Sequence, residues 1–416
     1  MPHPANTPAS RGSITGRGTS VEIRRAQSGE FLAGLTPVSH YFGSVPAEEN
    51  VRRFERVLRS ERMHVAEEDG TIVGGASAFE FQFTVPGAIV PAAGVTIVGV
   101  LPTHRRQGIL TQLMRAQLDD VHERGEPVAC LWASEETIYG RYGYGMAALC
   151  GEIELQRVYG SFRKPVEHGG TFRLLSYEEA LEAIPPVYAR VAAETPGMFA
   201  RPREWWEVRA LHDSEARRDG AGEMVRVVLE RDGEGIAYAI YRLKMGFEAG
   251  SSTGEVRVLE AMGVSPEATA GIWRFLLDVD WMDSVQAEIL PVDHPLFLLL
   301  EHPRRLRFRL ADSLWLRLVD VGAALAARSL EGDVVLEVED AFCPWNGARY
   351  ALDGSKTMED ADLRLDVADL ATVYLGGFTF AQLQRAGLVD EVTPGAVARA
   401  DAAFRTDRAP WCPEIF

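Results

Sequence analysis

The chain has 416 residues, of which 46% are hydrophobic and 25% are charged, a composition typical of a globular protein with two or three domains. Its formal net charge of −17 argues against general nucleic-acid binding, because domains that bind nucleic acids are usually basic. No apolar run reaches the roughly 18 residues that a membrane span needs, and the N-terminus lacks the apolar segment of a secretory signal. We therefore predict a cytoplasmic protein with neither nucleic acid nor membrane as a partner.

The first 20 residues are rich in Pro, Ser, Thr and Gly, which predicts a disordered N-terminal tail. The four cysteines are far apart and show no paired spacing, so we expect small core residues or occasional surface thiols, and no metal site. The acidic balance of the chain would attract a cationic substrate such as an amine.

The first third of the chain predicts strands and helices in alternation. An Asp69-Gly70 pair between two β-branched runs indicates a hairpin turn. In order, the patterns predict a strand over 21–25, an amphipathic helix through Phe31, Leu32 and Leu35, a helix over 47–59, hairpin strands over 64–68 and 71–83, and a central strand over 87–100.

Residues 95–118 combine a strand, a turn and an amphipathic helix. Arg105, Arg106 and Gly108 occupy the turn, directly before the helix begins. The first N–H groups of a helix lack partners and its dipole is positive there, so such an end binds anions. Alone, the stretch is better explained as an ordinary strand–helix unit that has a basic turn.

A second stretch follows a short apolar strand over 127–133. It is dense in Gly and Tyr, which suggests a chain that lies close to a ligand or to another backbone. Ser134 could cap the short helix that carries Tyr139.

Together the two stretches resemble a known family. The turn is similar to the acyl-CoA loop of GNAT acetyltransferases, although Leu110 stands where many members carry Gly or Ala. The Pro-Thr-His-Arg-Arg turn and the Ala-Ser-Glu…Ile-Tyr-Gly-Arg-Tyr-Gly-Tyr-Gly segment resemble the Eis family of actinobacterial N-acetyltransferases. The resemblance extends from residue 21 to the C-terminus.

The middle of the chain partly repeats the first order. Strands are predicted over 225–230, 235–244 and 254–262, and the helix after the last of them has Glu267 where a phosphate would be repelled. Two helices, over 177–183 and 187–193, are predicted to be separated by Pro185-Pro186. This region resembles a degenerate GNAT-like domain that binds no CoA.

The last segment changes character and resembles a sterol-carrier-like domain. Its patterns predict strands over 313–319 and 333–338, and helices over 321–328, 367–375 and 380–386. The expected fold class is therefore α/β (α+β), with tandem GNAT folds, the first active and the second degenerate, before a sterol-carrier-like domain. The predicted boundaries are 1–20 for the tail, 21–158, 159–304 and 305–416, with the C-terminal tail reaching the active site.

The resemblance implies acetyl-CoA as the cosubstrate. The backbone of Val98, Gly99 and Val100 would pair with pantetheine, and one of its N–H groups would polarise the thioester carbonyl. The other residues that the resemblance assigns to the cofactor are Arg105, Arg106, Gln107, Gly108, Ile109, Leu110 and Thr111 in the loop and helix, and Ser134 and Glu135 after the next strand.

Tyr139 is the candidate general acid, because a phenol with a pKa of about 10 is protonated at neutral pH and can donate to a departing thiolate. The alternative is that Tyr139, Tyr142 and Tyr144 only pack the sheet. The family's general base is the C-terminal carboxylate, which here belongs to Phe416, with Glu414 as the second candidate. The tail could instead be a simple apolar anchor.

The acceptor pocket is expected to include His40, Ile97, Glu414 and Ile415. His40 stands about where the mycobacterial members carry an acidic residue, which questions affinity for aminoglycosides but not acetyl transfer. His104 is expected to be a solvated turn residue.

The implied activity is N-acetylation of primary amines on a polycationic small molecule, with aminoglycosides modified at several positions as one case. Direct attack in a ternary complex is expected, because no Cys or Ser nucleophile with a partnering His is evident. The alternatives are a protein lysine or a polyamine as the acceptor, and a non-catalytic lipid- or ligand-binding protein. The resemblance also implies a homohexamer.

Overall fold

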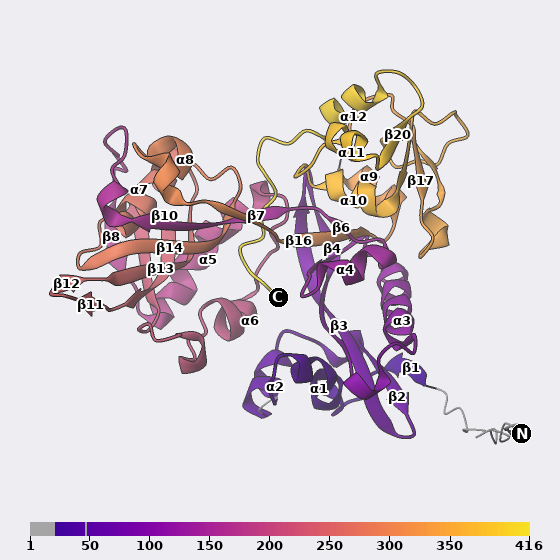
Figure 1. Cartoon of the computed structure of the whole chain (residues 1–416), viewed down its shortest axis with the longest axis horizontal. Coiled ribbons are helices and arrows are strands. Elements are labelled where there is room, and N and C mark those ends of the chain that lie inside the picture. The colour runs from indigo at the N-terminus through magenta and orange to yellow at the C-terminus, as the bar shows by residue number, and fades with distance from the viewer. Residues whose placement is uncertain (1–20, 46–47, 329) are drawn as a thin grey trace, which may run out of the picture.

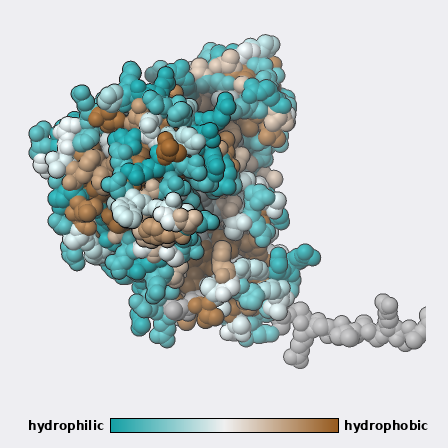
Figure 2. Space-filling model, turned by 60° about the vertical axis from the view of Figure 1, so that its left-hand side comes forward, coloured by the Kyte–Doolittle hydropathy of each residue, from teal (hydrophilic) through white to brown (hydrophobic). Residues whose placement is uncertain are grey.

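The computed structural model describes residues 21–45, 48–328 and 330–416, so the predicted N-terminal tail lies outside the described residues. Figure 1 shows three lobes, with two seven-stranded sheets and a smaller C-terminal unit above the first of them. No helix in these ranges is long and apolar enough to cross a membrane. Hydrophilic side chains cover most of the face drawn in Figure 2, with apolar ones in small patches between them.

The first sheet has the strand order β1-β2-β3-β4-β5-β16-β6. The strands are β1 Glu22–Arg25, β2 Met63–Glu68, β3 Thr71–Val85, β4 Ala88–Val100, β5 Val128–Trp132, β16 Leu314–Leu318 and β6 Gly145–Met146. Its helices are α1 Phe31–Tyr41, α2 Glu48–Phe54, α3 Ile109–Glu123 and α4 Glu136–Tyr139. The predicted hairpin is confirmed: Asp69 and Gly70 both have positive φ, as the tightest hairpin turns require.

The second sheet has the order β15-β7-β14-β13-β10-β9-β8. These strands are β15 Arg309–Asp312, β7 Leu149–Gln156, β14 Met282–Pro291, β13 Gly254–Gly263, β10 Glu234–Lys244, β9 Val225–Arg231 and β8 Thr171–Leu174, with a small hairpin of β11 Phe247–Glu248 and β12 Ser251–Ser252. Its helices are α5 Tyr177–Glu194, α6 Arg203–Trp205, which continues into a π-helical turn over Trp206–Ala210, α7 Pro266–Leu277 and α8 Leu296–Leu299.

The C-terminal unit has a four-stranded sheet in the order β18-β17-β19-β20. Its strands are β18 Ala348–Tyr350, β17 Leu336–Glu339, β19 Leu363–Asp366 and β20 Val389–Glu391, and its helices are α9 Val321–Ala327, α10 Val367–Tyr374, α11 Phe380–Ala386 and α12 Ala396–Phe404.

Two sequence predictions about helices were wrong. The helix predicted over 47–59 ends at Phe54, and its first residue lies outside the described residues. The two helices expected on either side of Pro185-Pro186 form one continuous helix, α5. Prolines in a helix interior cost about 3 kcal/mol, but one face of α5 is buried in an apolar cluster, and this packing keeps the helix whole.

Strands cross between the units. β7 comes directly after the strands of the first sheet in the sequence, but it pairs with β14 of the second sheet. β16 comes from the C-terminal part of the chain, but it pairs with β5 and β6 of the first sheet. Because strands are exchanged between the units near residues 149 and 318, the sheets do not divide the chain at single positions. The domain boundaries expected from the sequence remain a prediction.

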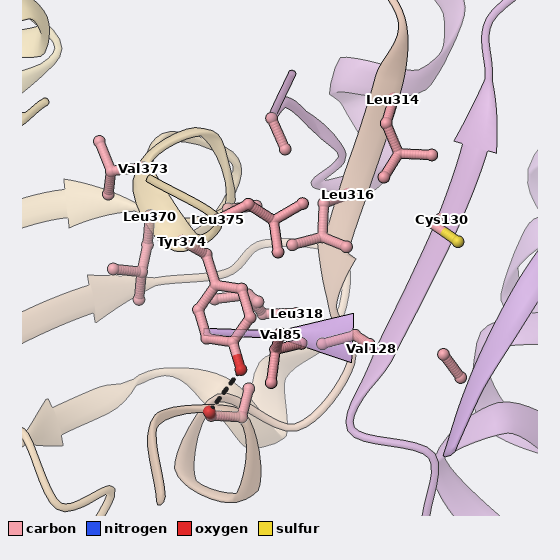
Figure 3. Close-up of a cluster of buried hydrophobic side chains, with 14 of the residues drawn as sticks. Val85, Val128, Cys130, Leu314, Leu316, Leu318, Leu370, Val373, Tyr374 and Leu375 are labelled. Atoms are coloured by element: carbon pink, nitrogen blue, oxygen red, sulfur yellow. Dashed lines mark hydrogen bonds between the residues drawn. The ribbon is translucent and has the colours of Figure 1, made fainter. Parts of the chain in front are cut away.

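The first sheet and the C-terminal unit share one core. Figure 3 shows leucines of β16 facing α10, with Val128 and Cys130 of β5 beyond them. The Tyr374 hydroxyl of α10 donates to the Ala324 carbonyl at 2.6 Å, so a buried polar group is satisfied inside this core. All four cysteines are buried and unpaired, as the sequence predicted. The shared core fixes the C-terminal unit, and hence the tail that follows it, against the first sheet.

Candidate active site

The site begins at a gap between β4 and β5. β4 pairs with β3 from Ala88 to Val100, but with β5 only at Ala92, Ala93 and Gly94. From residue 95 onward, that edge of β4 has no strand partner in the described part of the chain. Unpaired backbone N–H and C=O groups can accept an extended ligand as an added strand.

A β-bulge lies in the open part of β4. Ile97 and Val98 stand where β3 supplies the single residue Ala76, and Ile97 has a φ of 56°. Positive φ is rare for a β-branched side chain, and such strained residues cluster at functional sites.

Backbone groups of β4 point into the gap. Leu101 donates its N–H to the Val73 carbonyl across the ladder at 2.8 Å, so the alternation of an antiparallel pair turns Val98 and Val100 outward. The Tyr41 hydroxyl donates to the outward Val100 carbonyl at 2.5 Å. The N–H groups of Val98 and Val100 thus face the open edge, where an extended ligand could pair with them.

The basic turn presents positive charge beside this edge. Arg106 and Gly108 both have positive φ, at 62° and 82°, and no side chain caps the helix that starts after Gly108. Arg105 lies over the Tyr41 ring at 5.6 Å. An uncapped helix N-terminus next to two exposed arginines fits a pyrophosphate.

His104 supports the turn. Its Nε2 lies 2.8 Å from Glu68 Oε2, and its Nδ1 lies 2.7 Å from the Thr103 hydroxyl. The sequence suggested a solvated residue, but His104 instead ties the turn to the end of β2.

Tyr139 lies against the same gap. Its side chain is 7% exposed and belongs to an apolar cluster against which Val98 and Leu110 pack. Burial raises the pKa of Tyr139 to about 12, with smaller contributions from Tyr142 and Glu135. The phenol therefore keeps its proton across the neutral range. Tyr142 and Tyr144 are almost wholly buried, in keeping with the packing role predicted for them.

Phe416 reaches the site from the opposite face of the sheet. Its ring meets those of Phe81, Phe199 and Phe79 edge-on, with centroids 5.0, 5.8 and 6.4 Å away. Ile97 packs against the same cluster. Within the described residues, no ion pair or hydrogen bond is found for the C-terminal carboxylate.

The tail before Phe416 is pinned to the second unit. The Trp411 backbone N–H donates to Pro196 at 2.8 Å, and its indole N–H donates to Ile289 at 2.7 Å. Chain ends usually fray, so this anchoring allows a C-terminal group to have a defined position.

Glu414 is held by cations. Its carboxylate lies 3.1 Å from Arg201 Nη2 and 3.2 Å from Arg209 Nε, and it accepts a hydrogen bond from the Trp205 indole at 2.7 Å. A carboxylate with these partners anchors the tail and is poorly placed to take a proton from an amine. Glu414 thus has three partners, whereas none is found for the Phe416 carboxylate in the described part of the chain.

The remaining predicted residues are more loosely placed. Ser134 does not cap α4: the helix begins after Glu135, and no side chain caps it, so that suggestion was wrong. Thr111 Oγ1 lies 3.4 Å from the Tyr142 hydroxyl, and Gln107 is exposed in the turn. His40 is exposed in the last turn of α1, while Ile415 lines a cavity beside the tail.

The sequence did not reveal three further residues at the site. Tyr41 adjoins His40 but was not singled out, and only the fold places its hydroxyl on β4. Arg201 and Arg209 are more than 200 positions before the tail that they bind, and no local pattern marks them. In the described ranges, no group of three or more His, Cys, Asp or Glu is placed to hold a metal ion.

Family models match all three units. Models described as "Acetyltransferase (GNAT) domain" match residues 22–147 and 197–318, and one described as "Sterol carrier protein domain" matches residues 321–413.

Curated relatives and solved structures extend this similarity along the chain. An uncharacterized N-acetyltransferase of Streptomyces coelicolor is 44% identical over 395 residues, 90% of this chain and 94% of the relative. The N-acetyltransferase Eis of Mycobacterium tuberculosis is 34% identical over 358 residues, covering 81% and 84%. The crystal structure of Eis1 from Mycobacterium abscessus superposes with a TM-score of 0.83 at 36% identity, covering 95% of this chain and 100% of the other.

Proposed function

The chain belongs to the Eis family of GNAT N-acetyltransferases, and from this premise we propose that it transfers the acetyl group of acetyl-CoA to a primary amine by direct attack in a ternary complex. The observation that supports this most strongly is the open edge of β4 beside the uncapped N-terminus of α3. The relatives are named N-acetyltransferases, so the alternative of a non-catalytic binding protein is set aside.

The chain's own groups divide the work. The β4 edge would align the pantetheine arm, with the Val98 N–H polarising the thioester carbonyl. The turn from Arg105 to Gly108 and the first N–H groups of α3 would hold the pyrophosphate. Ser134 and Glu135 remain proposed cofactor contacts at the end of β5.

Proton transfers would involve the two faces of the sheet. The Phe416 carboxylate would take a proton from the acceptor ammonium, and the free amine would form a C–N bond to the acetyl carbon as the C–S bond breaks. The Tyr139 hydroxyl would hydrogen-bond the departing sulfur and pass its proton to it, and the second proton that the nitrogen loses as it becomes an amide would restore the phenol. An α-carboxylate in water is a weak base, and an apolar site such as that around Phe416 strengthens one.

The acceptor is the open part of the proposal. The resemblance favours a polycationic small molecule, including aminoglycosides modified at several amines, with a protein lysine or a polyamine as alternatives. His40, Ile97 and Ile415 are the proposed pocket residues. The cavity beside the tail, however, is lined by four arginines and two glutamates, which is not the acidic wall that a polycation needs.

The test is thiol release from acetyl-CoA by the purified full-length protein with kanamycin, neamine, spermidine and simple primary amines. We expect acetylated product with at least one amine. Absence of both product and CoA binding across the panel would reject the proposed activity. A cytoplasmic homohexamer also belongs to this proposal, and gel filtration tests the subunit count.

A further inference from the structure

A cavity of about 370 Å³ lies where the second unit meets the C-terminal tail. Its walls come from Arg201, from the π-helical turn after α6 and the segment that follows it, from β10, β13 and β14, and from residues 413–415. Figure 1 places the C-terminus beside α6, in the space between the two large sheets. The cavity therefore lies on the side of the tail that faces the second unit.

Arginine is the commonest side chain in its wall. Arg201, Arg209, Arg217 and Arg242 line the cavity together with Glu260 and Glu414. Four cationic side chains against two anionic ones give the wall an excess of positive charge.

Ion pairs neutralise three of these arginines. Arg201 Nη2 lies 2.7 Å from Glu260, Arg209 Nε lies 3.2 Å from Glu414, and Arg242 Nη1 lies 2.9 Å from Asp213, which is outside the cavity wall. Arg217 has no ion pair with any residue that the structure describes, and its side chain is partly exposed to solvent in the cavity wall.

A second unpaired arginine lies nearby on α2 of the first unit. The Arg53 Nε is buried without a hydrogen-bond partner, and no described residue forms an ion pair with Arg53. The pKa of Arg53 is lowered mainly by desolvation and next by the positive charge of Arg209. The pKa of Arg217 is lowered mainly by partial desolvation and next by the positive charges of Arg209 and Arg53. Glu49 and Glu414 oppose these shifts only in part, so three arginines from two units repel one another.

The arginine cavity is adjacent to the proposed base. Arg209 Nη2 donates to the Ile415 carbonyl at 2.5 Å, one residue before the C-terminal carboxylate. The Arg209 guanidinium also lies 6.0 Å from the centroid of Phe79, whose ring contacts Phe416. Arg209 therefore belongs both to the cavity wall and to the surroundings of the C-terminal residue.

We propose that this cavity binds the anionic group, a carboxylate or a phosphate, of the acceptor, with Arg217 of its wall as the principal partner, Arg53 adding positive charge from outside the wall, and Arg209 joining the cavity to the tail. The acceptor class is then a primary amine that also carries an anionic group, rather than a polycation. Arginine suits this task because its planar fork of donors matches carboxylate and phosphate oxygens. A bound anion would relieve the repulsion among the arginines, whereas a polyamine would add to it.

The acetylation of an anionic amine rests on the proposed acetyl transfer, whereas the binding of that amine in the cavity does not. Two measurements therefore test binding and acetylation separately. The first is calorimetric binding, without acetyl-CoA, of γ-aminobutyrate and phosphoethanolamine against butylamine, ethanolamine and spermidine. The second is thiol release from acetyl-CoA with the same five amines. The first two amines carry a carboxylate and a phosphate, and butylamine and ethanolamine are their counterparts without an anionic group.

We expect each anionic amine to bind at least about tenfold more tightly than its counterpart, and the tighter of the two identifies the group. Arg217→Gln should weaken the binding of the amine that carries the preferred anionic group about tenfold. It should lower by a similar factor the ratio of kcat/KM for that amine to kcat/KM for its counterpart without the anionic group. The matched control is Arg190→Gln, which removes a charge from the exposed face of α5, where Arg190 pairs with Glu234.

Every outcome decides between the two proposals. Binding of an anionic amine without turnover of any amine would keep the cavity and reject the proposed transfer. Turnover with spermidine or neutral amines equal to or faster than with the anionic pair, and no tighter binding of the anionic amines, would reject the cavity proposal and leave acetyl transfer standing. An equal loss in Arg217→Gln and Arg190→Gln would reject the role of Arg217.

Discussion

The two acetyltransferase units build the same gap and use it differently. In the second unit β13 pairs with its parallel neighbour β14 only as far as Val258, much as β4 leaves β5 after Gly94. The first gap is left open. At the second, Trp411 of the tail packs in one cluster with Met262 of β13 and donates its indole N–H to Ile289 of β14.

The helices that follow the two gaps, α3 and α7, differ in whether a side chain caps their N-termini. In the second unit the Ser265 hydroxyl caps α7 by accepting the Ala268 N–H at 3.2 Å. Hydrogen bonds from its own backbone and from Ser265 lower the pKa of Glu267, so a negative charge stands at that helix end. In the first unit Gly108 precedes α3 and no side chain caps it.

The comparison teaches how one fold unit can take two roles. An open strand edge and an uncapped helix suit the first unit to the cofactor half of the proposed site. A filled edge and a capped helix make the second unit the support for the tail, which brings the C-terminal carboxylate to the first. The predictions below test each side of this division.

The largest effect is expected from extending the chain. Two glycines after Phe416 would move the carboxylate out of the ring cluster and replace it with a peptide bond. We expect kcat to fall at least about 100-fold, the usual contribution of a general base. Acetyl-CoA binding should be unchanged, since its site lies on the first unit. The control is the same extension at the N-terminus, and full activity of the C-terminally extended enzyme would contradict the base role.

Replacing the proposed acid should come next. Tyr139→Phe keeps the ring and removes the proton donor, so kcat should fall about 100-fold while the KM for acetyl-CoA changes little. A larger change in KM than in kcat would assign Tyr139 to binding instead.

The pH profile sharpens this test. Burial raises the pKa of Tyr139 from about 10 to about 12, so the hydroxyl stays protonated below pH 10 and loses its proton only as the pH approaches 12. The ratio of wild-type to Tyr139→Phe rates should therefore stay constant from pH 7 to pH 10. A ratio that falls towards one near pH 8 would mean that the donor has a lower pKa than the structure implies.

A change in the turn would make the first unit resemble the second. Arg105→Glu places a carboxylate near the bare helix end, as Glu267 does at α7. We expect the KM for acetyl-CoA to rise about tenfold with kcat little changed, which is the scale of a lost charge-assisted contact. The matched variant is Glu267→Gln, which should leave that KM unchanged. A rise in both variants would mean that the second gap also binds the cosubstrate.

The smallest effect concerns the tail anchor. Trp411→Phe leaves the Ile289 carbonyl without its donor, which costs about 1–3 kcal/mol for a buried group. We expect a modest fall in Tm and faster removal of Phe416 by carboxypeptidase. Trp281→Phe, at a side chain 68% exposed, is the control. Equal digestion of the two variants would contradict the anchoring role of Trp411.

The sequence predicted the family, the tandem fold and the strand–turn–helix that carries the cofactor, because these depend on local periodicity and on two contiguous motifs. It missed the continuous α5, because tertiary burial of one face outweighs two prolines. It could not place Leu314–Leu318 in the first sheet, because strand pairing across almost 200 residues leaves no local pattern.

The charge of the site was also beyond local reasoning. A net charge of −17 describes the whole surface, whereas Arg201, Arg209 and Arg217 come together only when α6 and the tail are assembled. The expectation of a cationic substrate came from the net charge of the whole chain, and the charge of the cavity beside the tail differs in sign from that net charge.

The most direct test of the division between the units is the stoichiometry of acetyl-CoA binding, measured by calorimetry on the full-length protein. The account predicts one molecule per chain, with affinity lost in Arg105→Glu and retained in Glu267→Gln. Two equivalent sites per chain, or a single site that survives Arg105→Glu and disappears in Glu267→Gln, would contradict it.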